Sequence, residues 1–198
     1  MSVALTPAAG THRPRALLTI LVALLELAHL AWQWMHGGIV SHHLLANPDL
    51  PSVSNGWGLV ALPAVAWILS GRFLRRATSA SATRTILIAA LGAAGAGIGL
   101  SLAFSLGTPD HAAVVLLAIL LSGVVLSTYR AEYVLGFVLG MAWTFGPILP
   151  ILVGSVLALS SFLVRRVAWP AMGWAVARLR AYVASTVASA AGRRRSRS

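Results

Sequence analysis

Several apolar stretches of this chain are long enough to cross a lipid bilayer as helices, and they constrain the fold more than any other feature. Residues 15–35, 56–73, 85–106 and 111–128 carry few charges, and residues 134–164 carry none. A helix spans the hydrocarbon core with roughly 17–25 mainly apolar residues. Only 10% of the residues are charged, whereas a soluble domain has about 25%. The sequence therefore predicts an all-α, polytopic integral membrane helix bundle in contact with the lipid bilayer.

The arginines predict how these stretches cross the membrane. Positive residues collect on the cytoplasmic side, which places the arginine-rich segment 72–84 inside and the loop 36–56 outside. Residues 146–150 (GPILP) interrupt the last apolar stretch, so it crosses either once or twice. One crossing would leave Arg165 and Arg166 outside, whereas two crossings return them to the cytoplasm. We therefore expect about six transmembrane helices, the last pair short or re-entrant, with both termini cytoplasmic.

The polar segments divide the chain into three parts. Residues 1–14 form a cytoplasmic tail, and residues 15–166 form the membrane bundle. Prolines and turn dipeptides indicate that the external loop 36–56 is ordered, and Asn55 near its end is expected to cap the next helix. Residues 167–198 are typical of an interfacial amphipathic helix followed by a basic tail, which would bind anionic lipid headgroups. The alternative is a tail that only anchors the topology.

Composition excludes several classes of chemistry. The chain has no cysteine, which removes disulfides, thiolate metal ligands and iron–sulfur clusters. The formal charge of +11 does not indicate nucleic acid binding, because the arginines cluster at the ends of apolar stretches. All 15 basic residues are arginine, and with the abundant alanine this indicates a GC-rich coding bias. We expect the protein in the cytoplasmic (inner) membrane of a bacterium.

One side of the first apolar stretch is polar. Glu26, His29, Gln33 and His36 follow one another at positions i, i+3, i+7 and i+10, which places them within an arc of about 80° on a helix. A charged side chain at the centre of a membrane helix costs at least about 2.5–3.5 kcal/mol. The sequence therefore predicts that this stripe faces a protein interior or a water-filled cavity instead of lipid.

The same residues support a metal hypothesis. A Glu-x-x-His pair on one helix face occurs in metal sites of helix bundles, and imidazole is a ligand for zinc, iron or copper. The hypothesis makes Glu26, His29 and His36 ligands of one transition metal ion. His42 or His43 from the external loop would complete the site or act as acid and base, with Asp49 as a further catalytic residue. The alternatives are a metal-free polar pathway and a purely architectural network.

Four further polar residues lie near the ends of the apolar stretches. Asp110 and His111 are expected on the same external face as the loop. Arg130 and Glu132 are two positions apart, so on a helix they point in different directions and should not pair with each other. Arg130 is interpreted as a counter-ion of Glu26 or as a ligand of an anionic headgroup. The alternative is that this segment only anchors the cytoplasmic end of a helix.

Two sets of glycines indicate where helices pack closely. Gly92, Gly95 and Gly99 lie on one side of the third stretch, and Gly136 and Gly140 have the GxxxG spacing. Small residues at such spacings allow two helix backbones to approach each other. We expect each set to face a neighbouring helix.

Three functions fit these features. The first is a metal-dependent membrane oxidoreductase or hydrolase that acts on a lipid-soluble substrate at the externally accessible Glu/His site. The second is a proton- or cation-coupled transporter in which Glu26 and His29 relay the ion. The third is a non-catalytic subunit whose polar stripe docks a helix of a membrane-protein partner or of a second copy. Motifs of P-loop, Rossmann, zinc protease and serine hydrolase proteins are absent from the sequence.

Overall fold

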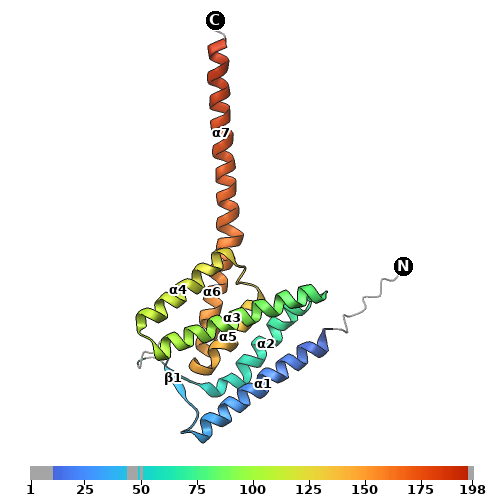
Figure 1. The fold of residues 1–198 in the computed structure, drawn as a ribbon, viewed down its shortest axis with the longest axis vertical. Coiled ribbons are helices and arrows are strands. Elements are labelled where there is room, and N and C mark those ends of the chain that lie inside the picture. Colours follow the sequence, from blue (N-terminus) through green and yellow to red (C-terminus); the bar gives the residue numbers. More distant parts are fainter. Residues whose placement is uncertain (1–10, 44–48, 50, 196–198) are drawn as a thin grey trace, which may run out of the picture.

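The computed structural model describes residues 11–43, 49 and 51–195 (Figure 1). The described chain is helical apart from two short strands in one loop. The helices are α1 (His12–Met35), α2 (Gly58–Leu74), α3 (Ala80–Leu106), α4 (Pro109–Val125), α5 (Ala131–Phe145), α6 (Ile148–Leu163) and α7 (Trp169–Arg195). Strands β1 (Ser41–His43) and β2 (Ser52–Ser54) pair in the loop between α1 and α2, and a 3-10 turn, η2 (Asn55–Trp57), leads into α2.

Among the described residues, four helical segments are long and apolar enough to cross a membrane. They are His12–Met35, Asn55–Leu74, Ala80–Leu106 and Ile148–Tyr182. Helices α4 and α5 are also apolar but shorter, with 17 and 15 residues. The prediction of a multi-pass, all-helical membrane protein is confirmed at this level.

The polypeptide breaks between α5 and α6, at the GPILP motif that interrupts the last apolar stretch. Gly146 has φ = +68°, a left-handed conformation that favours glycine. Pro147 follows and has no backbone N–H to continue the helix. The apolar stretch 134–164 therefore forms two helices that pack against each other rather than one kinked helix.

Helices α3 and α5 pack most closely, and they run parallel. A Cβ atom on Gly136 would collide with the Ala90 carbonyl, and one on Gly140 would collide with the Ala94 carbonyl. The backbones of the two helices are thus in direct contact, and the predicted GxxxG packing face of α5 is confirmed.

The prediction that Gly92, Gly95 and Gly99 of α3 face a neighbouring helix is wrong. A Cβ atom on Gly92, Gly95 or Gly99 would meet no atom within 4 Å. The glycine of α3 that does touch α5 is Gly97, which packs on the Phe137 carbonyl. At 100° per residue the three open glycines lie on the opposite side of α3 from this contact.

All arginines between residues 13 and 166 lie at one end of the bundle, named here the arginine face. Two contacts establish the directions of the helices. Arg76, after α2, pairs with Glu132 at the start of α5. Arg165, after α6, donates to the Val124 carbonyl at the end of α4. The arginine face thus contains the starts of α1, α3 and α5 and the ends of α2, α4 and α6, and the opposite end is named the loop face.

Helix α7 continues from α6 through a π-helical segment, Val164–Ala168, and projects away from the bundle (Figure 1). Its described side chains are exposed, Trp174 and Tyr182 among them. The segment predicted to be helical is helical. Its position on a lipid surface stays a prediction.

Candidate functional site

The polar stripe of α1 is mostly buried. Glu26, His29 and Gln33 have exposed fractions of 5%, 3% and 7%, respectively. They lie where α1 packs on the first turn of α2 and on α5. This burial agrees with the expectation that the stripe faces the protein interior, since the surrounding positions of α1 such as Leu25 and Leu27 are exposed.

A chain of hydrogen bonds connects these side chains to the loop. His29 Nδ1 lies 3.4 Å from Glu26 Oε2, and Gln33 Nε2 lies 2.9 Å from His29 Nε2. Gln33 Oε1 in turn accepts the Val40 backbone N–H at 3.1 Å and the Asn55 side-chain amide at 3.4 Å. This chain of hydrogen bonds therefore runs from the loop face to the middle of α1.

The backbone at Val40 determines the direction of every bond in this chain. Its N–H can only donate, so the Gln33 oxygen must face it and the Gln33 amide nitrogen must face His29. That amide can only donate, so His29 Nε2 accepts and the ring proton sits on Nδ1. His29 Nδ1–H therefore donates to the Glu26 carboxylate.

The chain of hydrogen bonds ends at a polar atom that has no hydrogen-bond partner in the described structure. Glu26 Oε1 is buried and has no hydrogen-bond partner in the described structure. It lies against Gly58 at the start of α2, where a Cβ atom would collide with it. The missing side chain of Gly58 is what makes room for the carboxylate.

Toward the arginine face, the packing beyond Glu26 is apolar. Val22 of α1, Leu62 and Ala66 of α2, and Leu135 and Val138 of α5 are all buried there. Arg15 is at the far end of α1, where its guanidinium stacks on Trp67 and donates to the Trp67 carbonyl. The polar chain thus reaches the loop face but not the arginine face.

Aromatic rings cover the side of His29 that Glu26 and Gln33 leave open. Trp143 of α5 stacks on the imidazole with 4.4 Å between ring centroids. Trp32 lies 5.9 Å from Trp143 and stacks on His36. His36 itself is exposed, and its Nδ1 donates to the Trp32 carbonyl at 2.8 Å. His36 is therefore separated from the Glu26–His29 pair by aromatic rings.

The loop residues contribute to the site through Asn55. β1 and β2 are antiparallel, with Ser41 opposite Ser54, and the Asn55 N–H donates to the Val40 carbonyl at 2.9 Å. This ladder brings Asn55, 3% exposed, onto Gln33. The expectation that Asn55 caps the next helix is wrong, because the side chain that accepts from Gly56 N belongs to Ser54. The Asn55 side chain is occupied by Gln33.

Three predicted catalytic residues are placed only in part. The backbones of His42 and His43 lie in β1, and their side chains fall outside the described part of the structure. Asp49 is exposed in a turn of the same loop.

Asp110 and His111 start α4 on the loop face and are exposed. His111 Nδ1 lies 2.7 Å from Thr108 Oγ1 and 3.2 Å from Thr108 N, which is a helix-capping arrangement. Among the described residues, no group of three His, Asp or Glu side chains comes together in a way that could hold a metal ion.

Arg130 and Glu132 lie on the arginine face and do not pair with each other, as predicted. Glu132 is 2% exposed and bonds to both guanidinium nitrogens of Arg76. The interpretation of Arg130 as counter-ion of Glu26 is wrong. Arg130 begins α5 at the far end of the bundle, and the apolar layer around Leu135 and Val138 lies between the two residues. In the described structure, the partner of Glu26 is His29.

Sequence reasoning missed Asn55, Gly58 and Trp143 as parts of the site. A polar asparagine and a glycine directly before an apolar stretch have many roles in loops, so the sequence carried no specific signal for them. Trp143 resembles any membrane tryptophan. Comparisons with models of protein families, with curated proteins and with solved structures found no match. The function must therefore be inferred from the site itself.

Proposed function

We propose that this chain is a six-span protein of a bacterial cytoplasmic membrane, and that Glu26 and His29 form its proton-exchanging site. The observation that carries this proposal is the Glu26 carboxyl group. It is 5% exposed, one oxygen faces His29, and the other oxygen has no partner in the described chain. A buried acid of this kind inside a membrane helix is most economically explained by a proton that binds and leaves.

The distribution of arginines supports the orientation. Every arginine of the bundle lies on the arginine face, which the positive-inside rule places in the cytoplasm. The loop face, to which the polar chain connects, is then external. Because six alternating helices begin and end on the arginine face, both termini are cytoplasmic in this topology. The short helices α4 and α5 cross with 17 and 15 residues, at and just below the lower limit of about 17 residues for a span.

A proton-exchanging pair explains the hydrogen bonds better than a metal centre does. Both ring nitrogens of His29 already have partners, Glu26 and Gln33. Binding of zinc, iron or copper by the ligand set Glu26, His29 and His36 would require His29 to leave one of them. It would also require His36 to leave Trp32, on the other side of the aromatic rings. The metal-dependent enzyme is thus the second candidate, supported only by the Glu26–His29 contact.

Each residue has a role in the proposed proton site. Glu26 binds the proton, and the His29 Nδ1–H stabilises the carboxylate when the proton leaves. Gln33 does not relay protons, because an amide neither gains nor loses one readily. It keeps His29 in the tautomer that points N–H at Glu26. The apolar layer below Glu26 prevents passage to the cytoplasm in this conformation, as a proton-coupled transporter requires of a closed state.

Infrared difference spectroscopy on the purified protein in lipid tests the proposal. We expect a carboxyl C=O band that titrates with pH, disappears in Glu26→Gln and shifts in His29→Ala. Glu132→Gln is the matched control, since Glu132 is the other buried glutamate and is paired with Arg76; it should leave the band in place. Absence of any titrating band that depends on Glu26 would overturn the proposal. One equivalent of bound transition metal, lost in Glu26→Ala and His29→Ala, would instead support the metal-dependent enzyme.

A further inference from the structure

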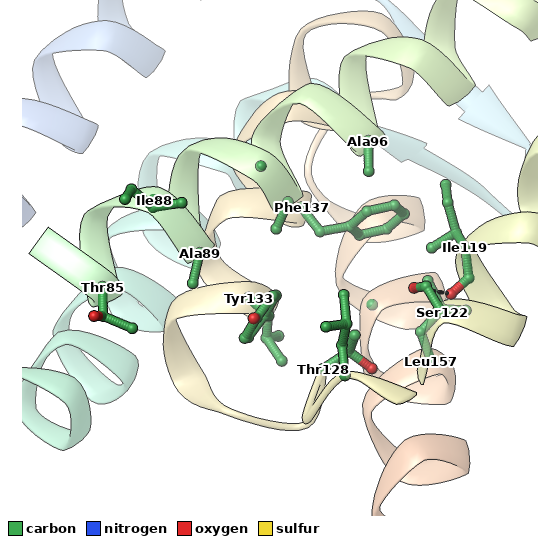
Figure 2. A pocket seen from close by; sticks show the side chains of 15 residues that line it. Thr85, Ile88, Ala89, Ala96, Ile119, Ser122, Thr128, Tyr133, Phe137 and Leu157 are labelled. Atoms are coloured by element: carbon green, nitrogen blue, oxygen red, sulfur yellow. Dashed lines mark hydrogen bonds between the residues drawn. The ribbon is translucent and has the colours of Figure 1, made fainter. Parts of the chain in front are cut away.

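A second feature of the bundle lies away from Glu26. Helices α3, α4, α5 and α6 enclose a half-open cavity of about 460 Å³ (Figure 2). This volume is within the roughly 300–1,000 Å³ of ligand pockets. We name it the inner cavity.

Close helix contacts lie on both sides of the inner cavity. Helix α3 is held to α5 by the Gly136–Ala90 backbone contact. Helix α4 is held to α6, because Ser161 Oγ donates to the Gly123 carbonyl at 2.8 Å. The inner cavity lies between these two helix pairs. Gly92 lines the inner cavity, and a Cβ atom added to it would meet no other atom within 4 Å.

The lining changes from polar to apolar along the cavity. Thr85, Thr128 and Tyr133 bring hydroxyl groups to the end near the arginine face. Ala96 and Phe137, further along α3 and α5, are apolar, and Figure 2 shows Ala96 on the opposite side from Thr128 and Tyr133. A ligand with one polar and one apolar end matches this gradient.

The length of the cavity matches one lipid leaflet. It extends along α3 from Thr85 to Ala96, which at 1.5 Å per residue is about 16 Å. The hydrocarbon core of a bilayer is about 30 Å thick, so one leaflet contributes about 15 Å. An acyl chain of the leaflet at the arginine face therefore fits the cavity along its length.

Arginines lie next to the residues that line the polar end. Arg84 directly precedes Thr85, Arg130 follows Thr128 by two residues, and both are exposed. The guanidinium of Arg166 beside the hydroxyl of Tyr129 lowers the pKa of that tyrosine. This charge is complementary to a phosphate headgroup at the cavity mouth.

We infer that the inner cavity binds an anionic phospholipid of the arginine-face leaflet, with one acyl chain between α3 and α4 and the headgroup at Arg130 and Arg166. The inference does not depend on the role of Glu26. The site differs from the predicted headgroup contacts of the C-terminal helix, because α7 projects away from the bundle.

Native mass spectrometry of the full chain in detergent tests the cavity. The probes are phosphatidylglycerol and phosphatidylcholine with the same acyl chains. We expect one retained phosphatidylglycerol per chain. The fraction of protein that retains it should fall at least tenfold in Gly92→Leu. Gly95→Leu is the matched control, because Gly95 is also open on α3 but does not line the cavity. Equal loss in both variants, no retained lipid, or a dimer in which a second copy replaces the lipid would overturn the inference.

Arginine variants test the headgroup contact. Arg130→Gln and Arg166→Gln should each lower the preference for phosphatidylglycerol by about fivefold, the effect of removing one cationic side chain near an anionic headgroup. Arg178→Gln on α7, whose guanidinium stacks on Trp174, should not change it. A preference that depends on Arg178 and not on Arg130 or Arg166 would move the anionic lipid site to the C-terminal helix and reject the inner cavity.

Discussion

At the scale of single residues, hydrogen-bond direction decides what the α1 stripe does. The Val40 N–H orients Gln33, Gln33 orients His29, and His29 presents its N–H to Glu26. Each side chain is thus held by a neighbour closer to the loop face. The loop backbone therefore determines the tautomer of an imidazole buried in the bundle.

Gln33→Ala should destabilise the protein by about 1–3 kcal/mol, because it leaves the Val40 N–H and the Asn55 amide without their acceptor. His36→Ala, three residues further along the stripe but exposed, should change stability by less than about 0.5 kcal/mol. Unfolding of both variants in the same detergent measures the difference. Equal changes in the free energy of unfolding would mean that the buried hydrogen bonds of Gln33 add no more stability than an ordinary surface side chain.

At the scale of helices, the glycines of α3 and α5 differ in what surrounds them. Gly136 and Gly140 are necessary where α5 touches the backbone of α3, whereas Gly92 and Gly95 face open space. Similar small-residue spacing in the sequence thus corresponds to a tight contact in one helix and to an opening in the other.

Alanine substitutions at two of these glycines should have opposite signs. Gly136→Ala should destabilise the bundle by about 1–3 kcal/mol, since its methyl group would overlap the Ala90 carbonyl. Gly95→Ala should stabilise it by about 0.5–1 kcal/mol, because alanine favours the helix and nothing lies within 4 Å. Thermal or denaturant unfolding in detergent measures both. A tolerated Gly136→Ala would contradict the direct backbone contact.

At the scale of the whole molecule, charge is segregated between the two ends of the bundle. The arginine face carries the pair between the exposed Arg76 and the buried Glu132, and the mouth of the inner cavity. The loop face carries the connection to His29 and Glu26. The two proposed sites thus connect to opposite ends of the bundle and can be tested separately.

The absence of cysteine from the sequence makes the proposed orientation directly measurable. In whole cells, Ser52→Cys on the loop face should react with a membrane-impermeant maleimide. Thr78→Cys on the arginine face should react only after the membrane is permeabilised. Both positions are exposed. Labelling of Thr78→Cys in intact cells would reverse the orientation, and with it the side from which Glu26 is reached.

The sequence by itself determined the membrane class, the interruption of the last apolar stretch at residues 146–150 and the burial of Glu26, His29 and Gln33. These follow from hydropathy and from the 3.6-residue helical period, which are properties of neighbouring residues in the chain.

Only the tertiary structure decided which groups meet. It separated His36 from His29, brought Asn55 to Gln33 across 22 residues, and placed Arg130 far from Glu26. It also selected Gly97 instead of Gly92, Gly95 and Gly99 as the contact of α3 with α5. The physical reason is that helical periodicity defines the faces of a helix, whereas the packing of distant segments determines which face finds a partner.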